Sequence, residues 1–263
     1  LGSYTSGTPA VPVIANDQYD FYVYDSTNDA TTNYDHVLIV PNASAKDGSK
    51  AVANLTEKQW ADVKVVLANP AGKTGGFYVK AMLLAPDLSQ FSLFFTSVAR
   101  SVATCTGCGY AGDFEDDLNK LFPSSTAADY AIFESGLVDA DTYVEQGLMW
   151  KDAHFAYLRY ILGTAPVPTV DGGSKAGLGY QPDLLMLGNP ATDEFSHMFL
   201  GLTVPTVNGL ANPYYNNYYS YGELISPEVA DGFIKDAYME ADATLALGKQ
   251  LMGDNTTMFA ASD

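Results

Sequence analysis

Residues 182–201 read PDLLMLGNPATDEFSHMFLG, and the predicted fold depends on this stretch more than on any other. Four apolar residues at 184–187 run without interruption, and the turn residues at 188–190 follow them. A short, continuous apolar run of this kind is typical of a strand that is buried on both faces of a parallel sheet. We therefore predict a buried strand over residues 183–188.

Asp193 and His197 follow this predicted strand and stand four residues apart. Side chains with that spacing share one face of a helix, with Cβ atoms about 5–6 Å apart. A carboxylate and an imidazole together suit Zn²⁺ or another transition ion, whereas the alternative is an ordinary surface ion pair or helix cap. Ligand sites gather at the carboxyl ends of strands in parallel sheets, so the position of the pair favours a metal site.

The flanking segments complete an α/β pattern. A short helix is predicted over residues 113–122, a longer one from Asp141 or Thr142 to Gly163, and another from Pro227. A second buried strand is predicted over residues 258–261, two residues before Asp263. Helix, strand, helix and strand with short connections indicate a parallel pair joined by a crossover. Asp193 and Asp263 would then point into one crevice.

The first part of the chain reads differently. Aromatic and β-branched runs separated by turn residues predict strands over residues 19–24, 36–40, 76–84 and 91–96. Thr56 and Gln59 have the spacing of a capping box, which predicts a helix carrying Trp60, Val63 and Val66. We expect two domains: a β-rich subdomain over residues 1–104, and a partial α/β core over residues 105–263.

The net charge limits the possible partners. Thirteen Lys and Arg against 31 Asp and Glu give −18, and such a surface repels the phosphate backbone of nucleic acids. A phosphorylated substrate would need local positive charge, for which a bound metal cation is a suitable source. No apolar run of about 18 residues is present, so no membrane span is expected.

Cys105 and Cys108 are the only cysteines. Within the sequence CTGCG they favour a small-ring disulfide in an exported protein, with free thiols as the alternative. We therefore expect a secreted or periplasmic protein. His154 lies on the apolar face of the long predicted helix, where a core histidine is favoured over a metal ligand.

The opening stretch resembles the metal-binding strand and turn of type I phosphodiesterases and nucleotide pyrophosphatases, a branch of the alkaline phosphatase superfamily. The matching positions are Pro182, Asp183, Pro190, Asp193, His197 and Gly201. The resemblance covers residues 140–263. It implies that Asp193 and His197 bind the first of two metals. It also implies that Ser262 and Asp263 begin a Ser-Asp-His-Gly motif in which Asp263 binds the second metal.

The same resemblance implies a fold and an activity. The fold would be α/β, with a partial parallel-sheet, alkaline-phosphatase-like core and residues 1–104 as an inserted or family-specific subdomain. The chain would be part of a hydrolase that cleaves small phosphate monoesters or diesters. The enzyme would use two divalent metal ions, which we expect to be zinc. A Thr or Ser nucleophile would lie outside this chain, in the remainder of its own polypeptide, so the fragment alone would be inactive. The alternative is a non-catalytic extracellular binding or structural module that retains the fold.

Overall fold

The computed structural model describes residues 13–14, 18–27, 29–103, 114–126 and 128–261. The chain divides into two compact units, Leu1–Thr126 and Ala127–Asp263. The expected boundary at residue 104 therefore differs from the observed division, because residues 114–126 belong with the first unit. Cys105 and Cys108 lie outside the described residues.

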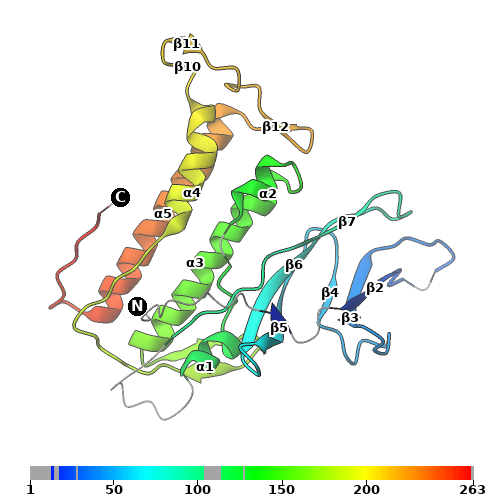
Figure 1. Ribbon diagram of the computed structural model, residues 1–263, viewed down its shortest axis with the longest axis horizontal. Helices are drawn as coiled ribbons and strands as arrows, with labels where there is room; N and C mark the ends of the chain where they lie inside the picture. The colour runs from blue at the N-terminus through cyan, green and yellow to red at the C-terminus, as the bar shows by residue number, and fades with distance from the viewer. Residues whose placement is uncertain (1–12, 15–17, 28, 104–113, 127, 262–263) are drawn as a thin grey trace. The chain divides into compact units, whose positions relative to one another are not determined.

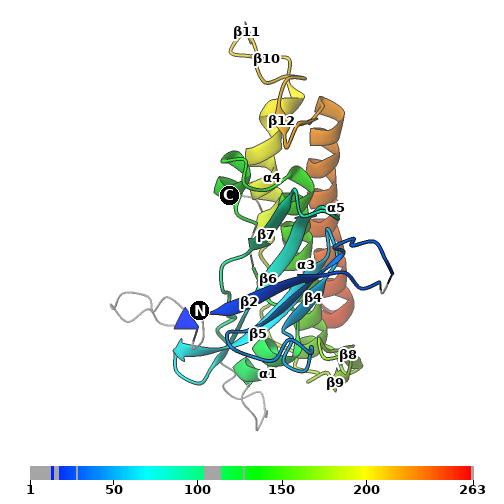
Figure 2. The ribbon, with the colours of Figure 1, turned by 90° about the vertical axis from the view of Figure 1, so that its right-hand side faces the viewer.

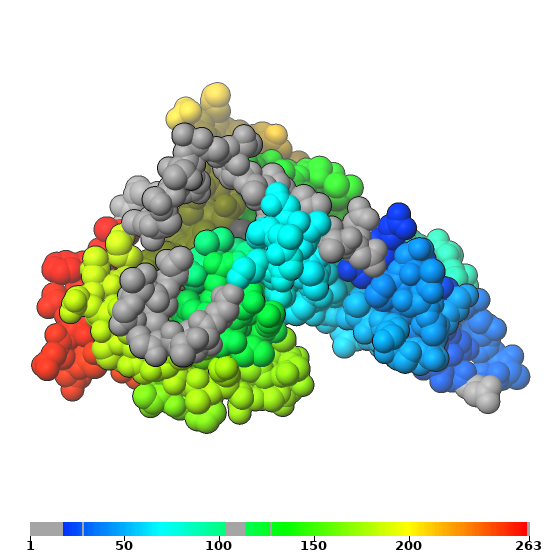
Figure 3. All heavy atoms as spheres, turned by 60° about the horizontal axis from the view of Figure 1, so that its bottom comes forward, coloured from blue at the N-terminus to red at the C-terminus, as the bar shows by residue number. Residues whose placement is uncertain are grey.

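The described residues of unit 1 form two antiparallel sheets and one helix (Figure 1). Its elements are β1 (Val13–Ile14), β2 (Tyr19–Tyr24), β3 (His36–Pro41), β4 (Ala53–Leu55), β5 (Trp60–Asn69), β6 (Thr74–Leu84), β7 (Phe91–Phe95) and α1 (Phe114–Leu121). One sheet has the order β2-β3-β4 and the other β1-β5-β6-β7. Inward side chains of both sheets, such as Ile39 and Val79, form one core cluster. Helix α1 contacts β6, and Figure 3 shows its atoms in green beside the cyan atoms of the second sheet.

The strands predicted at 19–24, 36–40, 76–84 and 91–96 are confirmed within one or two residues at their ends, but the helix predicted after Thr56 is wrong. The Gln59 side chain does accept hydrogen bonds from the Thr56 backbone (3.0 Å) and hydroxyl (3.2 Å). The chain then enters β5, where Val63 pairs with Phe77 of β6. Alternate residues of β5 are buried, and its β-branched valines suit a pleated strand. Pairing with β6 therefore overrides the local capping signal.

Unit 2 is mainly helical. Its helices are α2 (Tyr130–Glu134), α3 (Ala140–Leu162), α4 (Pro190–Phe199), the 3₁₀ turn η1 (Leu200–Thr203) and α5 (Pro227–Met252). Three short hairpins accompany them: β8 (Pro166–Pro168) with β9 (Ser174–Ala176), β10 (Thr206–Val207) with β11 (Leu210–Ala211), and β12 (Tyr219–Ser220) with β13 (Glu223–Leu224). Helices α3, α4 and α5 lie side by side in Figure 1 and in the perpendicular view of Figure 2.

The helices of unit 2 begin and end where their capping residues predict. The Asp139 side chain accepts a hydrogen bond from the Thr142 backbone at the start of α3, and Gly163 follows its last residue. Pro227 occupies the first turn of α5, behind the Ser226 cap. The predicted helices at 141–163 and from 227 are therefore confirmed, and the helix predicted at 113–122 is confirmed as α1 of unit 1.

The predicted parallel-sheet core is wrong. Every strand pair among the described residues is antiparallel, and residues 183–188 and 258–261 belong to no sheet there. Leu185 and Leu187 approach Gly248 of α5, at 3.9 and 3.0 Å from a Cβ built on that glycine. Leu184 and Met186, however, are 75% and 78% exposed. An apolar run becomes a sheet strand only where a neighbouring strand accepts its backbone hydrogen bonds, so this is not an alkaline-phosphatase-like α/β fold.

Candidate functional site

The first turn of α4 determines where the Asp193 carboxylate lies. Asn189 caps the helix, because its side-chain oxygen accepts a hydrogen bond from the Ala191 backbone at 3.1 Å. The Thr192 hydroxyl donates to the Asn189 carbonyl at 3.0 Å. Pro190 lies in the first turn, where its fixed φ favours helix initiation. These local contacts start the helix at Pro190 and place Asp193 in its first turn.

The opposite face of α4 is held by aromatic packing. Phe195 and Phe199 are fully buried, and their ring centroids lie 5.5 and 5.8 Å from that of Tyr143 on α3. Because α4 has an aromatic side that must face α3, its rotation about its own axis is determined. Asp193 and His197 are consequently directed to solvent.

Asp193 and His197 meet as their spacing predicts. The Asp193 Oδ1 lies 3.1 Å from the His197 Nε2, and the two side chains are 64% and 79% exposed. An exposed ion pair of this kind contributes about 1 kcal/mol or less to stability. The geometry is compatible with a surface ion pair and with two metal ligands that share one cation.

The donor set is suited to zinc but incomplete among the described residues. A carboxylate oxygen and an imidazole nitrogen are both zinc ligands, and tetrahedral zinc takes four ligands. No group of three or more His, Cys, Asp or Glu that could hold a metal is found in the described part of the chain. Asp263, the predicted ligand of the second metal, lies outside the described residues.

Asp193 also borders a hollow of about 690 Å³ in unit 2. The hollow is lined by Trp150, His154, Leu158, Met186, Leu187, Gly188, Asn189, Pro190, Thr192, Asp193, Thr244 and Ala261. His197 is absent from this lining. The Asn189 Nδ2 is buried and has no hydrogen-bond partner in the described structure. Space for a small group therefore exists on one side of the pair.

His154 is a satisfied histidine, as its position on the apolar helix face predicts. Its ring stacks on Trp150 with centroids 3.6 Å apart, and its Nδ1 donates to the Trp150 carbonyl at 2.8 Å. Burial lowers the pKa of His154, and the hydrogen bond to Trp150 opposes that shift in part. Its Nε2 is left as the acceptor of the neutral ring.

Sequence reasoning missed a polar cluster in unit 1. The Lys64 ammonium contacts the Asp62 carboxylate (3.0 Å), the Ser124 hydroxyl (2.8 Å) and the Phe122 carbonyl (2.7 Å). The Ser124 hydroxyl donates to Asp62 at 2.6 Å. Ser124 is 5% exposed, and a Cβ added at Gly76 would lie 2.0 Å from its hydroxyl oxygen. This cluster therefore joins the segment after α1 to β5 and has no room for a substrate. No local signal indicates it, because its partners lie about sixty residues apart in the sequence.

Comparisons of the chain with protein-family models, with curated proteins and with solved structures found no match. The resemblance carried by residues 182–201 is therefore a hypothesis about this site. Among the described residues, no helix is both long enough and apolar enough to cross a membrane.

Proposed function

We propose that this chain is part of a secreted or periplasmic, metal-dependent phosphoesterase in which Asp193 and His197 hold one of two divalent metal ions. The substrate would be a small phosphate monoester or diester. The observation that carries the proposal is the 3.1 Å approach of the Asp193 Oδ1 to the His197 Nε2 on the exposed face of α4.

Three features support a metal at this pair. Both donors are of the types that zinc prefers, and both are accessible to an ion and to a substrate. The capped first turn and the buried aromatic face of α4 hold the pair in place without using either donor. The sequence around the pair also carries the P-x-x-D-x-x-x-H spacing of type I phosphodiesterases.

The surrounding charge explains why a cation would be needed. A chain of net charge −18 repels a phosphate group unless a positive charge offsets the repulsion locally. A bound divalent ion would neutralise charge on the phosphoryl group. Asp193 and His197 would hold and orient that ion, whereas the Thr or Ser nucleophile would come from the remainder of the polypeptide. Asp263 is the proposed ligand of the second ion.

Metal binding tests the proposal directly. In calorimetric titrations with Zn²⁺, the variants Asp193→Asn and His197→Ala should each bind at least about tenfold more weakly than the unchanged chain, because each loses one ligand. Asp231→Asn is a matched control, since Asp231 also pairs with a residue four positions away, Lys235, on an exposed helix face. That variant should bind Zn²⁺ like the unchanged chain.

A second readout addresses the reaction. The complete polypeptide should hydrolyse bis-(4-nitrophenyl) phosphate and lose this activity in both the Asp193 and the His197 variants. Equal zinc affinity in all three variants, or full hydrolysis by both substituted proteins, would show that the pair is not a metal site of such an enzyme.

The competing function is a non-catalytic extracellular binding or structural module. The high exposure of both side chains favours it, since a solvated ion pair needs no metal. Under this alternative, the unchanged chain would show no saturable Zn²⁺ binding and the complete polypeptide would release no nitrophenol.

A further inference from the structure

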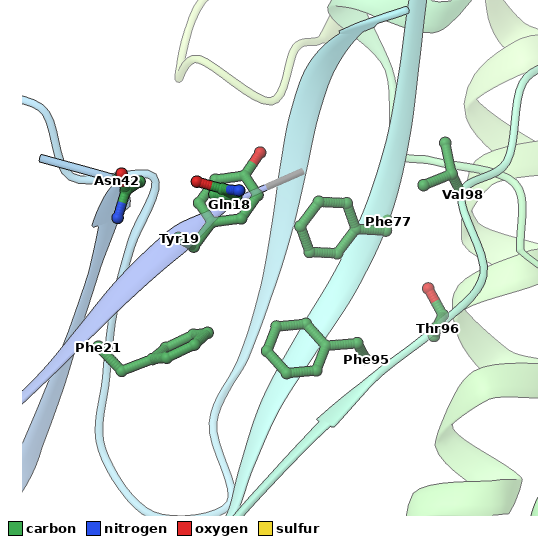
Figure 4. A pocket seen from close by; sticks show the side chains of 8 residues that line it. All are labelled: Gln18, Tyr19, Phe21, Asn42, Phe77, Phe95, Thr96 and Val98. Carbon is green, nitrogen blue, oxygen red and sulfur yellow. The ribbon is translucent and has the colours of Figure 1, made fainter. Parts of the chain in front are cut away.

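Unit 1 contains an apolar cleft that the proposed phosphoesterase site does not involve. The cleft has a volume of about 550 Å³ and lies between the two sheets of the unit (Figure 4). Its lining consists of Gln18, Tyr19, Phe21, Asn42, Phe77, Phe95, Thr96 and Val98. None of these residues is charged, although the chain as a whole carries −18.

Four aromatic rings form the walls of the cleft. Tyr19 and Phe21 come from β2 in one sheet, and Phe77 and Phe95 come from β6 and β7 in the other. Figure 4 shows that rings of the two sheets are directed toward one another. The Tyr19 and Phe77 centroids are 6.1 Å apart at 70°, and those of Phe21 and Phe95 are 5.8 Å apart at 61°. Aromatic rings prefer edge-to-face contacts of this kind, and a ring of a ligand can make the same kind of contact with these walls.

The inner and outer parts of the cleft differ in exposure. Phe77 is 6% exposed and belongs to the sandwich core, whereas Phe21 and Phe95 are each 39% exposed. Covering the two outer rings would remove apolar surface from water, which favours binding. The cleft therefore has a buried floor at Phe77 and a partly exposed apolar mouth at Phe21 and Phe95, where binding of an apolar ligand is favourable.

Two polar side chains of the lining, Thr96 and Asn42, form hydrogen bonds within the protein itself. The Thr96 hydroxyl accepts from the Tyr78 backbone (2.9 Å) and donates to the Ser97 carbonyl (3.2 Å). The Asn42 amide donates to the Asp20 carboxylate at 2.9 Å. An ionic ligand needs a counter-charge, and none of the lining residues supplies one.

We propose that this cleft is a binding site for an uncharged, apolar small molecule that contains at least one aromatic ring. Its volume lies within the range of about 300–1,000 Å³ that is usual for sites of small ligands. The ring of the ligand packs against Phe21 and Phe95 at the mouth, and its apolar part rests on Phe77. The site belongs to unit 1 alone and does not depend on Asp193 or His197.

N-Phenyl-1-naphthylamine is a suitable probe, because it is uncharged and its fluorescence rises in apolar surroundings. Titration into the unchanged protein should give saturable binding with one site per chain. Phe21→Ala and Phe95→Ala should each weaken binding by about threefold to tenfold, the loss expected for one aromatic contact. Phe21→Trp keeps a ring at the mouth and should bind within about twofold of the unchanged protein.

Phe91→Ala is the matched control. Phe91 lies on β7 like Phe95, is 42% exposed and is absent from the cleft lining. Its removal should leave the probe affinity unchanged. Thermal unfolding of every variant separates loss of the site from loss of the fold, and Phe21→Trp provides a second, ring-retaining comparison if Phe21→Ala unfolds.

Three results would overturn the proposal, two from the probe titrations and one from a competition experiment. The first is the absence of saturable probe binding by the folded, unchanged protein. The second is an equal effect of Phe91→Ala and Phe95→Ala, which would place the probe on a general apolar surface. Displacement of the probe by methyl β-glucoside would reassign the cleft to carbohydrates and contradict the commitment to an apolar ligand.

Discussion

Lys64 shows how single residues of unit 1 determine stability. Its side chain is 20% exposed, and its ammonium contacts Asp62, Ser124 and the Phe122 carbonyl. Burial lowers the pKa of Lys64, and the Asp62 charge opposes this shift. A buried charge is tolerated only where its partners replace the hydrogen bonds of water. The contribution of Lys64 to the free energy of unfolding therefore depends on the Asp62 carboxylate.

Removing that carboxylate should be costly. We expect Asp62→Ala to lower the free energy of unfolding by about 2–3 kcal/mol, since it leaves Lys64 without its counter-charge. The double variant Asp62→Ala with Lys64→Met should recover most of this loss. Urea denaturation measures both, with Asp231→Ala on the exposed surface of α5 as the control. A loss below about 0.5 kcal/mol for Asp62→Ala would mean that the cluster contributes little.

His154 makes stability depend on pH near neutrality. Its pKa in the folded protein lies below the ordinary value of 6.5, so the neutral ring is favoured by folding. The stability that it contributes is complete above about pH 6.5 and is lost as the pH falls through the folded pKa. Hydrogen bonds lower the pKa of Asp35 to about 2. The stability that the Asp35 carboxylate contributes is therefore lost only in much more acidic solution.

The melting temperature should therefore fall between pH 7.5 and pH 5.5. In His154→Phe, which keeps a ring on Trp150, this fall should be clearly smaller. Circular dichroism at the two pH values measures the difference, and His36 and His197, present in both proteins, cancel in the comparison. An identical fall in both proteins would show that His154 is not the group responsible.

At the scale of elements, residues 183–188 show most clearly that an apolar segment becomes a β-strand only when a neighbouring strand pairs with it. Leu185 packs against a small cluster of Leu158, Leu162 and Leu247, while Leu184 on its other side is 75% exposed. The alternation is that of a strand with one covered face. No neighbouring strand pairs with it in the described structure, so the run is extended without forming a sheet.

Alanine substitutions distinguish the two faces of this segment. Leu185→Ala should lower the free energy of unfolding by about 1–2 kcal/mol, because a partly buried side chain is lost. Leu184→Ala should change it by less than about 0.5 kcal/mol. Guanidinium denaturation compares the two. Equal losses would mean that both faces are buried, as the apolar run predicts on its own.

Helix α4 shows the opposite behaviour, in which local signals suffice. Asn189 and Pro190 start it, and Asp193 reaches His197 because four residues make about one turn. Strand β5 lies between these cases. The Thr56 and Gln59 capping-box residues do form their hydrogen bond. The valines that follow nevertheless adopt a strand conformation, because they pair with β6.

At the scale of the whole molecule, the chain combines a β-rich unit with a helical unit, each with its own core. The aromatic cleft belongs to the first, and the Asp193 and His197 pair to the second. The two proposed sites can therefore be tested separately, since a substitution in one unit leaves the contacts that build the other site unchanged.

The sequence by itself determined the features that depend on neighbours along the chain. These include both ends of α3, the start of α5, the strands β2, β3, β6 and β7, and the approach of Asp193 to His197. Only the tertiary structure decided that β5 is a strand, that residues 183–188 are not one, and that Lys64 meets Ser124. The physical reason is that caps and helical spacing act within about one turn, whereas sheet pairing, burial and clefts require groups brought together from distant parts of the sequence.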